Sequence, residues 1–86
     1  MNSQPDPLSD EELARLELLS KAATPGPWTS SLEGRDHRAG SHFVLTPNGD
    51  IELSSGAREA DYDFIAAART LMPRLLHELR ALRARP

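Results

Sequence analysis

AATPGPW, residues 22–28, holds two prolines, a glycine and the single tryptophan of the chain in seven positions. A residue that precedes proline is driven out of the helical region, so the helix before this stretch must end at Thr24. Pro25 and Gly26 suit the central positions of a type II turn, and Pro27 removes the N–H that would close it. The stretch therefore predicts a helix-to-strand corner, with the tryptophan at the start of the strand.

Two interpretations of this corner stay open. The chain has only four aromatic residues, and the large apolar surface of Trp28 stabilises a fold most when it is buried. That favours a structural anchor. Alternatively, Trp28 forms a rigid surface with Pro25 and Pro27 that stacks on a ligand or a partner peptide. The solvent exposure of the indole distinguishes the two.

Before the corner, the pattern predicts a helix over residues 10–23. Ser9 and Glu12 in SDEE have the spacing of a capping box, in which each side chain bonds the backbone amide of the other. Residues 1–8 contain two prolines and no periodicity, which predicts a disordered tail. Residues 9–86 then form a single small domain.

After the corner, a polar loop leads to a predicted β-hairpin with its turn within Thr46–Asp50. Asn48 and Gly49 readily adopt the positive φ that tight hairpin turns require. Strand alternation predicts that apolar side chains on one face meet across the hairpin. These side chains are Phe43, Leu45, Ile51 and Leu53.

The C-terminal part carries one long apolar stripe at helical spacing. Its members are Phe64, Ala68, Leu71, Leu75, Leu79 and Leu82. We expect this stripe to cover the sheet, with Phe64 as an anchor and Asp61 capping the helix start. Pro73 predicts two helical pieces, 61–71 and 72–84, with Thr70 capping the second, or else one kinked helix. The fold class is therefore α+β, with a small antiparallel sheet of two or three strands.

Composition excludes several kinds of function. The chain has 86 residues and no cysteine, which removes disulfides, thiol nucleophiles and thiolate zinc sites. It has no signal-peptide pattern and no apolar run of membrane-spanning length, so we expect a cytoplasmic protein. Acidic residues are concentrated in residues 1–20 and arginines in residues 69–86. These ends should attract each other, within one molecule or between two.

Few residues carry recognisable chemistry. Ser41 and two histidines, His37 and His42, occur in the polar loop, but their spacing matches no metal or nucleophile motif. Asp61 and Asp63 form a D-x-D that suits either a cation or helix capping, and we favour capping. We expect no metal, no cofactor and no catalytic residue. The C-terminal arginines lack interleaved aromatics, so nucleic-acid binding is not expected.

Arg69 follows three alanines, which leave space beside it. One interpretation is a salt bridge to an acidic residue of the first helix. The other is a cleft-facing guanidinium that holds a carboxylate or a phosphate through two parallel hydrogen bonds.

Two blocks, ATPGPW and DYDFIAAARTLMPRLLHELRAL, resemble small proteins of phages and prophages, especially those of actinobacteria. The chain is similar there to Ea22-like proteins over about residues 10–83. The resemblance implies a phage-type accessory protein in the cytoplasm of a host cell, and it assigns no activity or catalytic residue.

We therefore expect a non-enzymatic protein-interaction module that self-associates or binds a host or phage protein. The leucines of the helices exceed what a small sheet can cover, and exposed apolar stripes of that size usually find partners. The alternative is a protein that binds or sequesters a small nucleotide-like ligand, with Trp28 stacking on it and Arg69 holding its phosphate.

Overall fold

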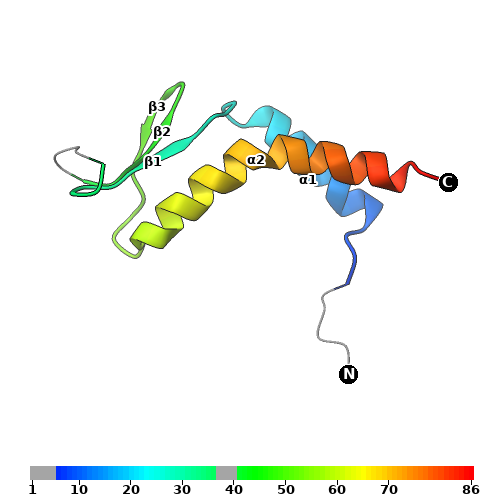
Figure 1. Ribbon diagram of the computed structural model, residues 1–86, viewed down its shortest axis with the longest axis horizontal. Helices are drawn as coiled ribbons and strands as arrows, with labels where there is room; N and C mark the ends of the chain where they lie inside the picture. The colour runs from blue at the N-terminus through cyan, green and yellow to red at the C-terminus, as the bar shows by residue number, and fades with distance from the viewer. Residues whose placement is uncertain (1–5, 37–40) are drawn as a thin grey trace.

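A computed structural model describes residues 6–36 and 41–86. It confirms the α+β arrangement, with a helix, a three-stranded antiparallel sheet and a second helix in chain order (Figure 1). The elements are α1 (Asp10–Ala22), β1 (Thr29–Ser31), β2 (Phe43–Thr46), β3 (Gly49–Ile51) and α2 (Glu59–Arg83).

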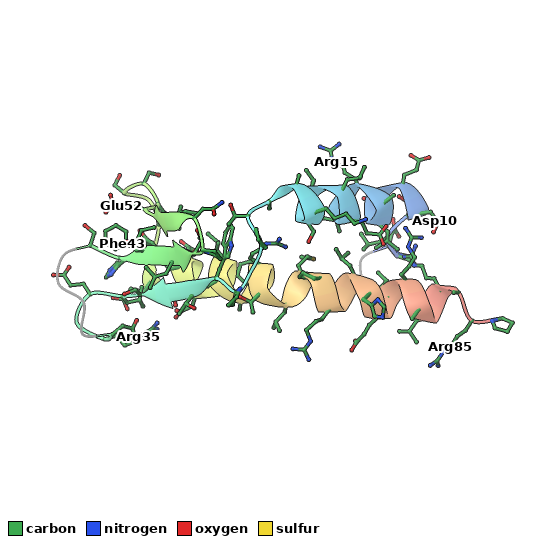
Figure 2. The ribbon with its side chains drawn as sticks, turned by 90° about the horizontal axis from the view of Figure 1, so that it is seen from above. Asp10, Arg15, Arg35, Phe43, Glu52 and Arg85 are labelled. Carbon is green, nitrogen blue, oxygen red and sulfur yellow. The ribbon has the colours of Figure 1, made fainter. Side chains whose placement is uncertain are left out.

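The molecule is elongated, with extents of 52 × 35 × 18 Å. Its radius of gyration is 16.1 Å, whereas a compact domain of this length would have about 12 Å. The first half of α2 lies under the sheet and its second half runs antiparallel beside α1 (Figures 1 and 2). One face of α2 therefore supports the sheet and α1 in succession.

The start of α1 confirms the predicted capping box. The Ser9 hydroxyl accepts a hydrogen bond from the Glu12 amide at 3.0 Å, and the Glu12 carboxylate accepts one from the Ser9 amide at 2.9 Å. At the other end, the Ala23 amide still bonds the Leu19 carbonyl, and Ala23 is already extended. The helix thus ends beside Thr24, as the following proline requires.

The corner differs from the predicted type II turn. Gly26 lacks the positive φ that such a turn needs at its second central residue, and the Gly26–Pro27 peptide is cis. The type II turn predicted at Gly26 is wrong, because Gly26 does not adopt the positive φ of that turn. The strand expected after Trp28 is present as β1.

The hairpin prediction is confirmed, and Pro47 and Asn48 form its two-residue loop between the paired residues Thr46 and Gly49. The Thr46 hydroxyl accepts a hydrogen bond from the Asn48 amide at 3.1 Å and donates one to the Gly49 carbonyl at 2.8 Å. Gly49 has a φ of 130°, which residues other than glycine rarely adopt.

The buried face of β2 is the one not expected from the sequence. Val44 is fully buried, while Phe43 and Leu45 on the other face are only half-buried. Ser30 pairs with Val44 across the sheet, and its hydroxyl reaches Asp63 on α2, so this face points at the helix. The prediction that Ile51 meets Phe43 and Leu45 on one face is wrong, because Ile51 pairs with Val44 and therefore shares the face of Val44.

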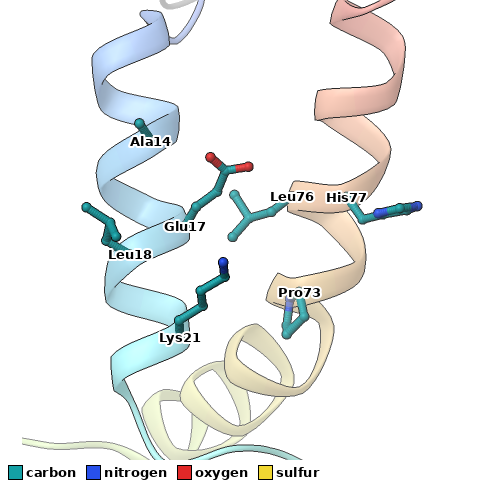
Figure 3. A pocket seen from close by; sticks show the side chains of 7 residues that line it. All are labelled: Ala14, Glu17, Leu18, Lys21, Pro73, Leu76 and His77. Atoms are coloured by element: carbon teal, nitrogen blue, oxygen red, sulfur yellow. The ribbon is translucent and has the colours of Figure 1, made fainter.

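Helix α2 is continuous through Pro73, so the prediction of two separate helical pieces is wrong. Its axis changes direction near Pro73 (Figures 1 and 3). Proline removes one backbone hydrogen bond, and contacts on both sides of it keep the helix intact. Thr70 does not cap a second piece, because its hydroxyl bonds the backbone of Trp28.

The small core is built on a different face of α2 from the predicted one. Leu32 and Val44 pack with Tyr62 and Ala66 in one cluster, against which Trp28 lies half-buried. The ring of Tyr62 is buried, and its hydroxyl accepts a hydrogen bond from the Leu53 amide at 3.2 Å. Leu13 and Leu76 are buried on α1 and α2.

Phe64 is 73% exposed, so its prediction as an anchor is wrong. Tyr62 and Phe64 lie two positions apart and therefore on opposite sides of the helix. The helix turns Tyr62 inward because that ring can be buried with its hydroxyl bonded. The richest apolar stripe is consequently turned outward.

Candidate functional site

A pair of long-range hydrogen bonds joins the corner to α2. The Trp28 amide donates a hydrogen bond to the Thr70 hydroxyl at 3.0 Å, and that hydroxyl donates one to the Trp28 carbonyl, also at 3.0 Å. The indole Nε1 donates to the Thr24 carbonyl at 3.2 Å. Pro25 and Pro27 on either side of Gly26 are exposed. All three polar groups of Trp28 are thus bonded within the chain, and its indole is half-buried.

Arg69 contacts neither a carboxylate nor an open cleft. Its Nε donates to the Thr24 carbonyl at 2.9 Å, its Nη1 to the Ser20 hydroxyl at 2.8 Å and its Nη2 to the Ser20 carbonyl at 2.9 Å. The expected salt bridge to an acidic residue of α1 is therefore wrong. Instead, the guanidinium caps the C-terminal end of α1, where carbonyls lack helical partners and the helix dipole favours a cation.

These contacts bring together the two sequence blocks on which the family resemblance rests. ATPGPW, residues 23–28, supplies Thr24 and Trp28, and the second block, residues 61–82, supplies Arg69. A Cβ added at Gly26 would lie 3.7 Å from the Thr70 Cα, an ordinary contact distance. The ATPGPW stretch therefore has a structural role, because its contacts fix the corner on α2.

Asp61 and Asp63 diverge and do not form a cation site. The Asp61 carboxylate accepts a hydrogen bond from the Arg58 amide at 2.8 Å, which confirms its capping role at the start of α2. Asp63 accepts two from Arg35, at 2.9 and 3.0 Å, and one from Ser30. The Arg35 and Ser30 bonds lower the pKa of Asp63 to about 2. Over residues 6–36 and 41–86, no three His, Cys, Asp or Glu side chains are placed to hold a metal ion.

Of the two histidines of the polar loop, the described one, His42, makes its contacts within the fold. His42 Nδ1 accepts a hydrogen bond from the Glu33 amide at 3.0 Å, and its ring meets Tyr62 edge-on at 5.6 Å. Ser41 is exposed, and His37 lies outside the described residues.

The oppositely charged ends of the chain pair within one molecule. Arg80 bonds Glu17 at 2.6 Å, and Arg83 bonds Asp10 at 3.0 Å. The Arg80 guanidinium lowers the pKa of the Glu17 carboxyl through this hydrogen bond. These two arginines hold α1 against α2, which leaves less positive charge available to a phosphate backbone.

The most prominent exposed feature is an apolar surface on α2, here called the outer stripe. It consists of Phe64, Ala68, Leu71, Leu75 and Leu82. The four large side chains are 73%, 49%, 59% and 56% exposed, in that order along the chain. Their spacing puts them on one side of the helix, nearly half a turn from the face that packs on the sheet and α1.

A second apolar feature is an open groove between α1 and α2 with a volume of about 530 Å³. It is lined by Ala14, Glu17, Leu18, Lys21, Pro73, Leu76 and His77 (Figure 3). Leu76 points into it from α2, and Glu17 and Lys21 from α1 place charge beside it (Figure 3). The groove is on the Pro73 side of α2, away from the outer stripe.

No family model matches the chain, and no curated protein or solved structure matches it either. The resemblance to Ea22-like proteins thus stays a prediction. In the described part of the chain, no helix is long and apolar enough to span a bilayer.

Sequence reasoning found the members of the outer stripe but placed them in the core. The signal that could have oriented α2 is Arg69 with Thr70. Both lie on or beside the helix face opposite the stripe, and both have the donors that a helix end and a corner need. A search for apolar periodicity alone does not consider such polar side chains.

Proposed function

We propose that this protein is a non-enzymatic interaction module that self-associates through the outer stripe. The observation that carries the proposal is the exposure of Phe64, Leu71, Leu75 and Leu82, each at least 49% exposed, on one side of one helix. Large contiguous apolar surfaces that stay exposed on a folded chain usually mark sites of interaction with another molecule.

The balance of buried and exposed apolar residues supports the same proposal. In the described part of the chain, six hydrophobic residues are buried, whereas eight large hydrophobic residues are exposed. Half of those eight belong to the outer stripe. Pairing two stripes would move their apolar surface out of water and extend the small core, which stabilises the folded chain.

The stripe has dimensions suited to a helix of a second copy. From Phe64 to Leu82 it extends about 27 Å, at 1.5 Å per residue. Two helices packed along such a length bury their side chains in one another's grooves. If the resemblance to phage and prophage proteins holds, this module acts in the cytoplasm of a host cell as an accessory protein.

No comparable observation favours the small-ligand alternative. The indole N–H of Trp28 and three N–H groups of Arg69 are bonded within the chain. A phosphate would have to compete with the carbonyls that Arg69 already caps.

Two matched variants test the proposal. Leu75→Gln lies in the outer stripe, where the side chain is 59% exposed, and Leu18→Gln replaces a leucine on α1 that is somewhat more exposed, at 70%. Loss of a buried leucine from each of two copies should weaken a dimer at least tenfold, at about 1.5–3 kcal/mol each. We expect that shift in the dissociation constant, measured by dilution, for Leu75→Gln alone. Equal effects of the two variants would contradict the proposal.

A further inference from the structure

We propose that the second copy lies antiparallel on the outer stripe, with a two-fold axis passing beside Pro73 between Leu71 and Leu75. This inference rests on the proposed function, since it specifies the arrangement of the self-association. It follows from the spacing of the apolar residues, the distribution of charge along α2 and the placement of the other elements.

The spacing of the stripe is symmetric about Pro73. Leu71 and Leu75 each lie two positions from it, and Phe64 and Leu82 each lie nine positions from it. In an antiparallel pair, Leu71 therefore faces the partner's Leu75, and Phe64 faces the partner's Leu82. A two-fold contact needs a surface that is complementary to itself in this way.

Charge decides between antiparallel and parallel pairing. Asp63 is already paired with Arg35, and Arg80 and Arg83 are paired with α1. The charges that remain available include Glu59 and Asp61 in the first turn of α2 and Arg85 just beyond its last turn. A parallel pair would align like charges at both ends of the helix. An antiparallel pair aligns opposite charges and opposes the two helix dipoles.

One pair of charges fits this arrangement closely. Asp61 and Arg85 are both exposed. Because Asp61 lies in the first turn of α2 and Arg85 just beyond its last turn, an antiparallel pair brings Asp61 to the end of the partner's helix from which Arg85 extends. Arg80 and Arg83 are engaged with α1, but within the described residues Arg85 has no ion-pair partner and extends from the end of α2 (Figure 2).

The approach of a second helix is open on this side. The sheet and α1 contact the Tyr62 and Leu76 side of α2, away from the stripe. Ala67 and Ala68 lie on or next to the stripe and have small side chains, so a helix can approach closely there. The contact can therefore extend along most of α2.

Cysteine cross-linking tests the arrangement directly, because the natural chain contains no cysteine. Ala68 and Glu78 each lie five positions from Pro73 and on the same side of the helix as the stripe. In the antiparallel pair, Ala68 faces the partner's Glu78. Two copies of the same position are about 15 Å apart along the helix, whereas a disulfide needs Cα atoms within about 7 Å.

We would prepare Ala68→Cys and Glu78→Cys separately and oxidise each alone and as a mixture, with Arg15→Cys on α1 as the control for random collision. The expected result is a disulfide-linked dimer only in the mixture of Ala68→Cys with Glu78→Cys. Cross-linking of each variant with itself indicates parallel pairing and overturns the inference. A dimer that forms no cross-link in any sample also overturns it.

The oligomeric state of the same samples separates a failure of the antiparallel arrangement from a failure of the proposed self-association. Variants that are dimeric but cross-link in the wrong combination contradict the antiparallel arrangement and leave the proposed function standing. If the wild-type chain and all variants are monomeric at every concentration, both the antiparallel arrangement and the proposed self-association are contradicted.

Discussion

Arg69 is the residue whose role changed most between sequence and structure. Sequence reasoning offered a salt bridge or a ligand, because those are the usual partners of a semi-buried guanidinium. In the structure, Arg69 bonds two backbone carbonyls and one hydroxyl at the end of α1. Such partners cannot be predicted from residue type, since every residue has a carbonyl and only the fold decides which ones lack a donor.

Arg69→Lys should therefore destabilise the chain although it keeps the charge. Lysine cannot reproduce the planar fork that bonds Ser20 and Thr24 together, and the unbonded carbonyl groups should cost about 1–3 kcal/mol of unfolding free energy. Urea denaturation followed by Trp28 fluorescence, at one protein concentration, measures this. Arg74→Lys on the exposed side of α2 is the matched control and should change little. Equal stability of the two variants would show that Arg69 does not cap α1.

The bonded carboxylate of Asp63 should make the stability of the folded chain depend on pH. Its pKa is lowered to about 2 by Arg35 and Ser30, so the folded state binds a proton less readily than the unfolded chain does. The stabilisation is fully present above the unfolded pKa near 4 and is lost as the pH falls through about 2. The difference in stability between wild type and Asp63→Asn should shrink over that interval. Glu52→Gln, which removes the charge of an exposed carboxylate away from Arg35, is the control, and its stability difference from wild type should not shrink in this way.

At the scale of elements, local signals were predictable and long-range ones were not. The capping box at Ser9 and the hairpin loop before Gly49 depend on residues within three positions of each other, and both predictions are confirmed. The face of α2 that packs inward depends on Thr70 and Trp28, which are 42 positions apart. Apolar periodicity locates a stripe but does not say whether the rest of the chain or another molecule covers it.

The bond between the corner and α2 gives a prediction at this scale. Thr70→Val keeps the shape of the side chain but removes the hydroxyl that bonds the Trp28 amide and carbonyl. Leaving those partly buried groups unbonded should lower the unfolding free energy by about 1–3 kcal/mol. Thr70→Ser keeps the hydroxyl and should recover most of that loss. Thermal or urea unfolding of both variants measures this loss. Equal stability of Thr70→Val and Thr70→Ser would contradict the stabilising role of this hydroxyl.

At the scale of the whole molecule, the chain is a thin layer of helices and sheet with its own core on one side of α2 and an apolar stripe on the other. Its radius of gyration of 16.1 Å reflects that shape. Charged contacts such as Arg80 with Glu17 close the helix pair, but exposed ion pairs contribute little to stability. Covering the outer stripe by self-association, as we propose, would therefore add more to the stability of the chain than these ion pairs do.

Sedimentation equilibrium of the wild-type chain over a range of concentrations tests that claim most directly. The account predicts a species of twice the chain mass of 9.5 kDa at high concentration, with dissociation on dilution. A mass that stays at that of one chain up to about 0.5 mM, far above the micromolar range of a specific dimer, would contradict it.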